Sequence, residues 1–269
     1  KFKSNISSNL PKNTINNNSK INLEPKHKSN LSINDYQSID KSDFYSKVTD
    51  SLITSSGLND NNKSIYDKLK PKFVVNAGFF DPKNHQTVSY VTIDGHLVLN
   101  PKNNTNLMEN EALKPYMEKI LNRSEFRILE NKKGKFKYDI ALHNASVENG
   151  YKLKHSIQAG PMLYPDLRLE DEFFILVRDG KIISESASSL HKYARTGIGI
   201  KENKVYVFIV TGEAPMSLEE LSDLTKKWGM EKAMAFDGGG STSFDSKELH
   251  IISQEAGQGR KLKSFLVLK

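Results

Sequence analysis

The chain has 269 residues, of which 37% are apolar and 26% are charged, so it is long enough for one sizeable globular domain and is neither a fibre nor a repeat array. Its longest uninterrupted apolar run, Val205–Val210, is strand-sized and far shorter than the roughly 20 residues of a membrane span. The net charge of +7 does not indicate a nucleic-acid binder, because five of these charges lie in residues 1–34 and the remainder shows no basic stripe.

The sequence contains no cysteine, which excludes disulfides, thiolate metal sites and a cysteine nucleophile. It begins at Lys1 rather than at Met, which indicates a processed or trimmed chain. Residues 1–34 are rich in Asn, Ser and Lys without a sustained period, so they cannot bury enough apolar surface to offset the entropy lost on ordering. We predict a disordered basic lead-in over residues 1–34, dispensable for stability and function, and a folded domain over residues 35–269.

In the first half of this domain, short apolar runs alternate with turns, a pattern typical of short strands with a few helices between them. Helices are predicted over residues 44–53, 64–70 and 106–121, the last with a break near Pro115. Strands are predicted over residues 73–75, 88–93, 97–99 and 125–143, with turns at Asp94-Gly95 and at Gly134 that form hairpins.

The second half is dominated by strand patterns, over residues 173–177, 181–184, 198–200, 205–210 and 233–236. The best-specified helix is predicted over residues 218–228, where Ser217 and Glu220 can form a capping box and Gly229 ends the helix. Its apolar stripe indicates packing on a sheet. Together these elements predict an α+β fold, a single domain with a central, mostly antiparallel sheet flanked by a few helices.

The strand over residues 233–236 leads into Asp237, which three consecutive glycines and Ser241 follow. Residues without a Cβ let the backbone approach a ligand closely, and successive N–H groups can bind an anion such as a phosphate. Asp237 can act there as an acid, a base or a nucleophile. The alternative is a flexible turn, since the loop lacks the lysine of a nucleotide-binding P-loop.

Other strands carry polar residues next to small ones. Asn76 precedes the run Ala-Gly-Phe-Phe, so its amide can bind a sugar hydroxyl while an aromatic ring floors a sugar pocket. Arg195 begins a strand of small residues, where its planar guanidinium can bind a phosphate with two donors. Core packing of the rings and a surface salt bridge of Arg195 are the alternatives. Gln158 precedes Ala-Gly-Pro in the same manner, and His143 is a candidate proton carrier or a structural residue.

These motifs, in this order, resemble those of the phosphodiester glycosidase family. The resemblance covers about residues 64 to 269 and rests on Asn-Ala-Gly-Phe-Phe at 76–80, Gln-Ala-Gly-Pro at 158–161, Ala-Arg-Thr-Gly-Ile-Gly at 194–199, Leu-Glu-Glu-Leu at 218–221, Asp-Gly-Gly-Gly-Ser at 237–241 and the stretch 260–267. Two features depart from the family pattern. Ala77 stands where glycine is commoner, and Thr211-Gly212-Glu213 stands where many relatives have Asp-Gly-Arg.

The resemblance implies hydrolysis of the bond between a sugar anomeric carbon and a phosphodiester oxygen, which releases free sugar and leaves a phosphomonoester. It implies a catalytic domain over residues 35–269 that acts on a small-molecule or polysaccharide sugar-phosphate, without a cofactor, a metal, a nucleic-acid partner or a membrane span. It also implies a secreted, periplasmic or cell-envelope location and an association with exopolysaccharide. The implied catalytic residues are Asp237, Arg195 and Asn76. The implied substrate-binding residues are Gly78, Phe79, His143, Gln158, Gly160, Thr196, Gly238, Gly239, Gly240 and Ser241.

Two other classes of function remain open at this level. A protein that binds a glycan or phosphoglycan without turnover would keep every motif and would not need Asp237 as a reactive group. A metal-dependent phosphodiesterase would need clustered His and Asp ligands, and the sequence shows no HxH, HxD or DxD pair near the motifs.

Overall fold

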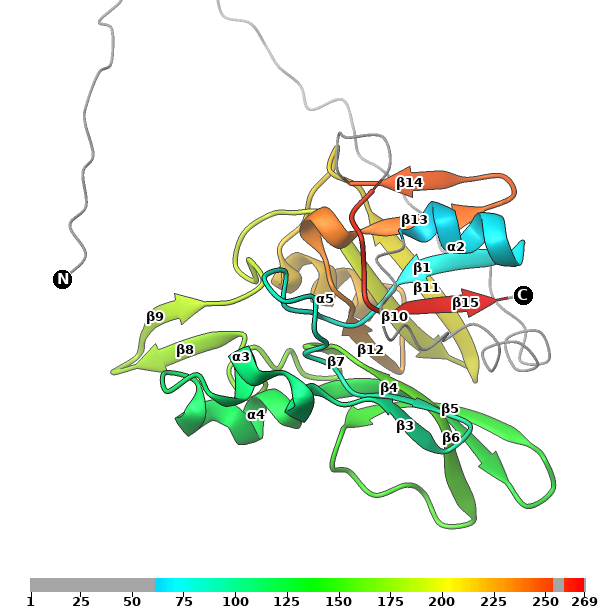
Figure 1. Ribbon diagram of the computed structural model, residues 1–269, viewed down its shortest axis with the longest axis horizontal. Coiled ribbons are helices and arrows are strands. Elements are labelled where there is room, and N and C mark those ends of the chain that lie inside the picture. Colours follow the sequence, from blue (N-terminus) through cyan, green and yellow to red (C-terminus); the bar gives the residue numbers. More distant parts are fainter. Residues whose placement is uncertain (1–60, 254–258, 269) are drawn as a thin grey trace, which may run out of the picture. The chain divides into compact units, whose positions relative to one another are not determined.

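The computed structural model describes residues 61–253 and 259–268, so the predicted lead-in and the helix predicted over residues 44–53 lie outside the described residues. The α+β fold predicted from the sequence is confirmed, and all strand pairs in the described ranges are antiparallel. The strands form three sheets and a two-stranded hairpin where one central sheet was expected (Figure 1).

The three sheets are most simply described by their strand order. The first has the order β14-β13-β1-β15, with bounds His250–Ile252, Ser243–Ser246, Phe73–Asn76 and Phe265–Leu268. The second has the order β11-β10-β12-β7, with bounds Lys204–Val210, Arg195–Lys201, Lys232–Ala235 and Met162–Tyr164. The third has the order β3-β2-β6-β4-β5, with bounds His96–Leu99, Val91–Ile93, Tyr151–Gln158, Ser124–Asn131 and Phe136–Leu142.

A separate hairpin projects from the domain at the left of Figure 1. It is formed by β8 (Ile175–Arg178) and β9 (Lys181–Glu185), which pair only with each other within the described residues. Ile182 and Ile183 are both about half exposed, at 51% and 54%. Because successive residues of a strand point to opposite faces, both faces of the hairpin are open to solvent.

The helices are short and begin at side-chain caps. Helix α2 (Asn62–Leu69) begins at Asn61, whose side chain accepts the Ser64 N–H at 2.8 Å, and ends at Lys70 in the left-handed conformation. Helix α5 (Leu218–Lys227) has the predicted capping box of Ser217 and Glu220. The remaining helices are α3 (Thr105–Met108), α4 (Met117–Leu121) and the 3₁₀ turns η2 (Pro101–Asn103), η3 (Lys114–Tyr116) and η4 (Gly239–Ser241). None of the helices in the described ranges is long and apolar enough to cross a membrane.

One apolar core joins the three sheets. Val75 of β1, Ile140 of β5, Ile198 of β10 and Met234 of β12 are fully buried within it. A second cluster forms where α5 packs on the second sheet through Leu221, and a third where α2 packs on the first sheet. Each such aliphatic side chain contributes about 1.5–3 kcal/mol by its burial, so these contacts fix the sheet ends on which the polar motifs lie.

The predicted elements differ from the observed ones mainly where burial depends on distant partners. In place of the continuous helix predicted over residues 106–121, the structure has two short helices, α3 and α4, and between them a 3₁₀ turn that contains Pro115. Strands β13, β14 and β15 had no predicted counterpart. Each is three or four residues long, and β13 and β15 are buried because they flank β1 on either side.

Candidate active site

The sequence motifs converge where strands of all three sheets end or begin. Asp237 follows β12, and its N–H donates to the Ala77 carbonyl, just beyond β1, at 2.8 Å. Gly160 follows β6, and its N–H donates to the Ala235 carbonyl at 3.1 Å. Arg195 begins β10, the neighbour of β12. The structure therefore brings all four motifs together at one edge of the domain. We call this edge the rim; it comprises the segments around Asn76, Gln158, Arg195 and Asp237.

Asn76 holds this rim together from within. Its side chain is buried, its amide nitrogen donates to the Asp237 carbonyl at 2.5 Å, and its oxygen accepts from the Thr196 hydroxyl at 2.7 Å and the Ser243 N–H at 3.0 Å. An amide oxygen with two donors has no lone pair left for a sugar hydroxyl. These hydrogen bonds give Asn76 and Thr196 positioning roles within the rim, and the direct substrate contacts expected from the sequence stay a prediction.

Asp237 is the titratable group at the centre of the rim. Burial raises the pKa of its carboxyl to about 6, although the Ser241 hydroxyl, the positive charge of Arg260 and the Gly238 N–H all act to lower it. Arg260 Nη1 also donates to Ser241 Oγ at 3.3 Å. A carboxyl with this pKa is largely ionised at pH 7 yet takes up a proton just below, which suits a catalytic group.

The glycine loop is more ordered than a flexible turn. Gly239 has a φ of 56° and lies in the 3₁₀ turn η4. Its N–H donates to the Ala194 carbonyl, and the N–H groups of Ser241 and Thr242 donate to carbonyls within the loop. The loop therefore offers fewer free donors to an anion than the run of successive amides expected from the sequence.

Arg195 is buried beside this loop. A Cβ placed on Gly238 would lie 3.7 Å from Arg195 Nη1, so glycine allows the loop to approach the guanidinium. Arg195 forms no salt bridge with any described carboxylate, and Glu185 is the acid whose charge acts on it. Burial lowers the pKa of the guanidinium, which nevertheless stays charged at all ordinary pH values. The rim therefore contains a desolvated positive charge close to Gly238, the residue that follows Asp237.

Two buried arginines also fasten the projecting β8–β9 hairpin. Arg195 donates from Nε to the Met216 carbonyl at 2.9 Å and from its terminal nitrogens to the carbonyls of residues 187, 188 and 191, beyond β9. Arg123 donates to the carbonyls of residues 172 and 173, before β8, at 2.9 and 3.0 Å. Most of the Arg195 N–H groups thus donate to carbonyls within the protein. Of the two donors expected to bind a phosphate, the structure leaves an N–H of Nη1, near Gly238.

Gln158 and Gly160 build the wall of the rim. The Gln158 amide is buried, donates to the carbonyls of Leu121 and Arg123 at 2.9 and 3.1 Å, and accepts from the Tyr90 N–H at 3.3 Å. Gly160 has a φ of 87°, and a Cβ there would lie 2.3 Å from the Glu172 carboxylate. Both residues therefore shape the site through internal contacts, and their predicted contact with a substrate stays a prediction.

Replacing Gly160 with Ala is expected to destabilise the fold by about 2–4 kcal/mol, because the methyl group displaces the buried Glu172 carboxylate in addition to straining a left-handed backbone. Gly150 is a matched control, since it has a φ of 88° with nothing within 4 Å of its Cβ position. Gly150→Ala should cost only about 1–2 kcal/mol. Urea unfolding of both variants measures the difference, and equal losses would contradict the assigned contact.

An aromatic and cationic cluster lies beside the Gly78 segment. Phe79 is partly exposed and packs against Phe174 with ring centroids 5.7 Å apart. The Arg123 guanidinium lies 4.0 Å from the Phe174 ring centroid and 5.8 Å from that of Phe79. Burial lowers the pKa of Arg123 to about 10. Phe79 therefore presents an apolar surface beside a fixed positive charge.

His143 lies at the end of the wall that contains Gln158. Its ring stacks on Tyr90 with centroids 4.0 Å apart, and its Nδ1 lies 2.8 Å from Oε2 of the buried Glu125.

The sequence did not indicate four of the groups near the rim as site residues, namely Arg123, Glu125, Tyr90 and Arg260. Glu125 and Arg127 stand two residues apart in a strand, and this spacing is ordinarily the signature of a solvent-facing edge.

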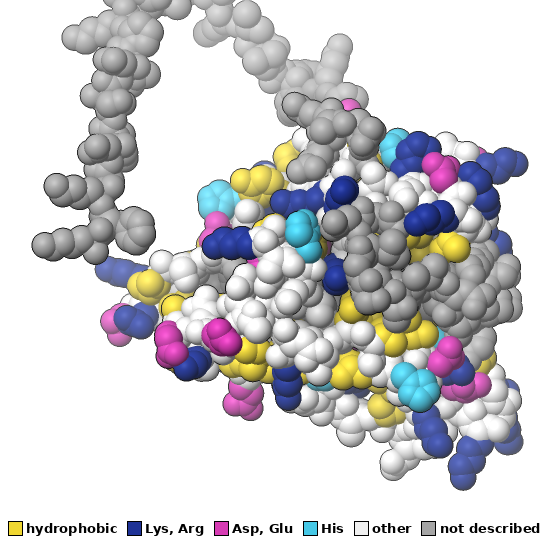
Figure 2. All heavy atoms as spheres, in the orientation of Figure 1, with side chains coloured by type: hydrophobic (Ala, Val, Ile, Leu, Met, Phe, Trp, Pro, Cys, Tyr) yellow, Lys and Arg dark blue, Asp and Glu magenta, His cyan; other side chains and the backbone are white. Residues whose placement is uncertain are grey.

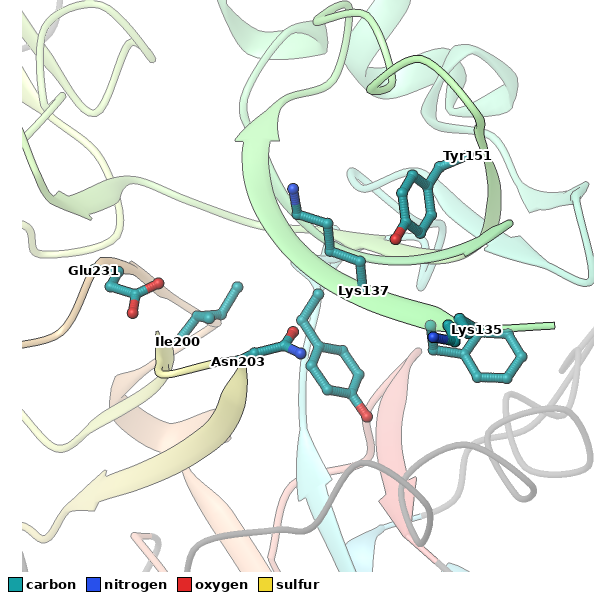
Figure 3. A pocket seen from close by; sticks show the side chains of 8 residues that line it. Lys135, Lys137, Tyr151, Ile200, Asn203 and Glu231 are labelled. Carbon is teal, nitrogen blue, oxygen red and sulfur yellow. The ribbon is translucent and has the colours of Figure 1, made fainter. Parts of the chain in front are cut away.

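A cleft in the described part of the chain lies elsewhere. It has a volume of about 510 Å³ and is lined by Lys135, Phe136, Lys137, Tyr138, Tyr151, Ile200, Asn203 and Glu231 (Figure 3). Ile200 is near the end of β10 opposite Arg195, and Glu231 precedes β12. The cleft therefore opens at the other end of the strands whose near ends form the rim, and it contains none of the predicted site residues.

The face drawn in Figure 2 has basic and acidic side chains interspersed over its edges. Basic side chains on this face do not gather into one stripe, as a groove that follows a nucleic-acid backbone would require.

Comparisons with known proteins agree with this arrangement. A family model for phosphodiester glycosidases matches residues 70–269. No curated protein sequence is a significant match.

Three solved structures are similar in fold. The catalytic domain of zebrafish N-acetylglucosamine-1-phosphodiester alpha-N-acetylglucosaminidase, auto-inhibited by its pro-peptide, has a TM-score of 0.54 and 16% identity over 78% of this chain and 66% of that one. A hypothetical protein from Synechocystis has a TM-score of 0.50 and 14% identity over 78% of this chain and 54% of that one. A protein of Burkholderia pseudomallei K96243 described as exported has a TM-score of 0.52 and 10% identity over 78% and 68%. The chain thus spans just under two thirds of the zebrafish domain.

Proposed function

Because this chain belongs to the phosphodiester glycosidase family, we propose that it hydrolyses the bond between the anomeric carbon of a sugar and a phosphodiester oxygen. The products are the free sugar and a phosphomonoester. The observation that carries this proposal is Asp237, a carboxyl with a pKa raised to about 6 on which the charge of Arg260 acts. Its loop approaches the desolvated guanidinium of Arg195 at Gly238.

The chemistry of the substrate matches these groups. A phosphate is a good leaving group, so the reaction needs stabilisation of the departing anion more than it needs an acid. Arg195, through its Nη1 edge near Gly238, and Arg260, which donates to Ser241, provide positive charge at the glycine loop. In this proposal the ionised Asp237 stabilises the positive charge that develops at the anomeric carbon, as carboxylates of glycosidases do.

The partly exposed face of Phe79 is assigned to the sugar. The apolar face of a pyranose packs on an aromatic ring, and the neighbouring Arg123 binds the ring rather than the substrate.

A location outside the cytoplasm belongs to the same proposal. It is supported by the likeness in fold to a protein described as exported.

The proposal is tested by incubating the protein with sugar-1-phosphodiesters, such as UDP-N-acetylglucosamine and synthetic methyl phosphodiesters of several sugars, and measuring released reducing sugar. In water enriched in oxygen-18, cleavage of the sugar–oxygen bond places the label in the sugar. Label in the phosphate would show a phosphodiesterase that breaks the P–O bond, and binding without release of either product would show a binding protein.

A further inference from the structure

A buried carboxylate orients the ring of His143. Glu125 is 1% exposed, and its Oε2 lies 2.8 Å from His143 Nδ1, while its Oε1 accepts from Arg127 Nε at 2.7 Å. A nitrogen that faces a carboxylate carries the ring proton, so Nε2 is the acceptor in the neutral imidazole. The His143 side chain is 25% exposed. The pair therefore leaves Nε2 as the one basic nitrogen of a partly exposed ring.

The position of this ring is determined at four points. The His143 N–H donates to the Arg123 carbonyl at 3.2 Å, and the His143 carbonyl accepts from Arg127 Nη2 at 2.9 Å. The ring stacks on Tyr90 with an interplanar angle of 4°, and Nδ1 contacts Glu125. Taking Glu125 and Arg127 out of water costs several kcal/mol per ion. This buried ion pair contacts both the ring and the backbone carbonyl of His143, so it fixes the orientation of the ring. The arrangement is that of a base oriented by a carboxylate.

The pair lies next to the proposed site through Gln158. The Gln158 amide accepts from the Tyr90 N–H and donates to the same Arg123 carbonyl that holds His143. On the other side, a Cβ at Gly78 would lie 3.0 Å from the Gln158 carbonyl oxygen. The segment 77–79 is therefore flanked by the loop of Asp237, through Ala77, and by the wall that contains His143.

We propose that His143 is the general base of the reaction and that Glu125 is its positioning residue, an inference that rests on the proposed function. His143 Nε2 accepts a proton from water as the water oxygen bonds to the anomeric carbon. The bond from that carbon to the phosphate oxygen breaks, and its electron pair remains on the phosphate. Asp237 stays ionised throughout, and His143 returns its proton to solvent. The charged and titratable groups around the ring are Glu125 and Arg127 on β4 and Tyr90 before β2.

The first test replaces His143 with Asn, whose amide nitrogen can keep the contact with Glu125 but cannot take up a proton. We expect kcat to fall on the order of 10³-fold, with KM and the melting temperature nearly unchanged. His96, exposed at the start of β3, gives the control His96→Asn, which should match the wild type.

A second pair of variants separates catalysis from folding. His143→Ala should regain activity when imidazole is added, because the free base enters the vacated position, and this holds even if His143→Asn lowers the melting temperature. Glu125→Gln should lower kcat on the order of 10²-fold with KM retained, and imidazole should not rescue it.

The two proposals fail in different ways. If the wild-type chain releases no sugar from any sugar-1-phosphodiester, the proposed function is wrong and the role of His143 falls with it. If the wild type is active and His143→Asn keeps its kcat, the function stands and the base is another group.

Discussion

Replacing Asp237 with Asn is expected to lower kcat/KM on the order of 10³-fold or more. The amide has nearly the shape of the carboxyl but carries no negative charge, so it cannot stabilise the cationic anomeric carbon. Initial rates of sugar release measure the effect. Asp245→Asn is the matched control, because Asp245 is a buried aspartate in β13, shortly after the glycine loop, and has no part in the proposed reaction.

The same variant separates an enzyme from a binding protein. A protein that only binds a phosphoglycan should keep its affinity in Asp237→Asn and has no turnover to lose. In the enzyme, wild-type kcat/KM should also rise with pH through about 6, the pKa of Asp237, because the ionised form is the active one. A rate that is flat between pH 5 and pH 7 would contradict this role.

Stability provides an independent check on the environment of Asp237. Its pKa is raised in the folded protein, from 3.8 to about 6, so the folded state binds the proton more tightly than the unfolded state does. This contribution to stability is fully present below about pH 4 and is lost as the pH rises through 6. Relative to Asp237→Asn, the wild type should therefore have a similar melting temperature at pH 4 and a lower one at pH 8. Equal differences at both pH values would show that the carboxyl is not buried.

Replacing Arg195 with Lys is expected to lower kcat/KM on the order of 10²-fold and to destabilise the fold by about 1–3 kcal/mol. The guanidinium donates to four carbonyls, and an ammonium with three donors cannot reach all of them. A guanidinium that only bound a phosphate would give a loss of activity with little loss of stability. The buried contacts of Arg195 make both losses the expected result.

Steady-state kinetics and thermal unfolding of the same preparations measure the two effects of Arg195→Lys. The control is Arg178→Lys, because Arg178 is exposed on the projecting hairpin, and it should change neither quantity. If Arg195→Lys melts early but keeps normal kcat/KM per folded molecule, Arg195 is structural only. The departing phosphate would then be stabilised mainly by Arg260 and the glycine loop.

Much of this architecture is readable from local sequence. Helix α5 was predicted almost to the residue because its capping box and apolar stripe are contacts within a dozen residues. The position of Asp237 directly after a short buried strand was predicted for the same reason, since glycine runs and apolar runs specify backbone conformation locally. The family resemblance added the order of the motifs, which no single motif conveys.

The roles of individual side chains within the motifs were less accessible. Asn76, Gln158 and Thr196 look from the sequence like ligands for a substrate, and the structure uses each of them in internal hydrogen bonds. A polar residue at a strand end has the same local signature whether it faces solvent or another strand. Its partners are distant, as the separation of 161 residues between Asn76 and Asp237 illustrates.

The sequence by itself determined the α+β class, the capped helix and the positions of the polar strand ends, because local sequence patterns specify each of them. Only the tertiary structure decided which charges are buried and what they face. Glu125 and His143 meet because β4 pairs with β5 in a register that places Glu125 opposite Ala141, two residues before His143. Burial and pKa depend on such long-range pairing, since desolvation is a property of everything packed around a group and not of its neighbours in the chain.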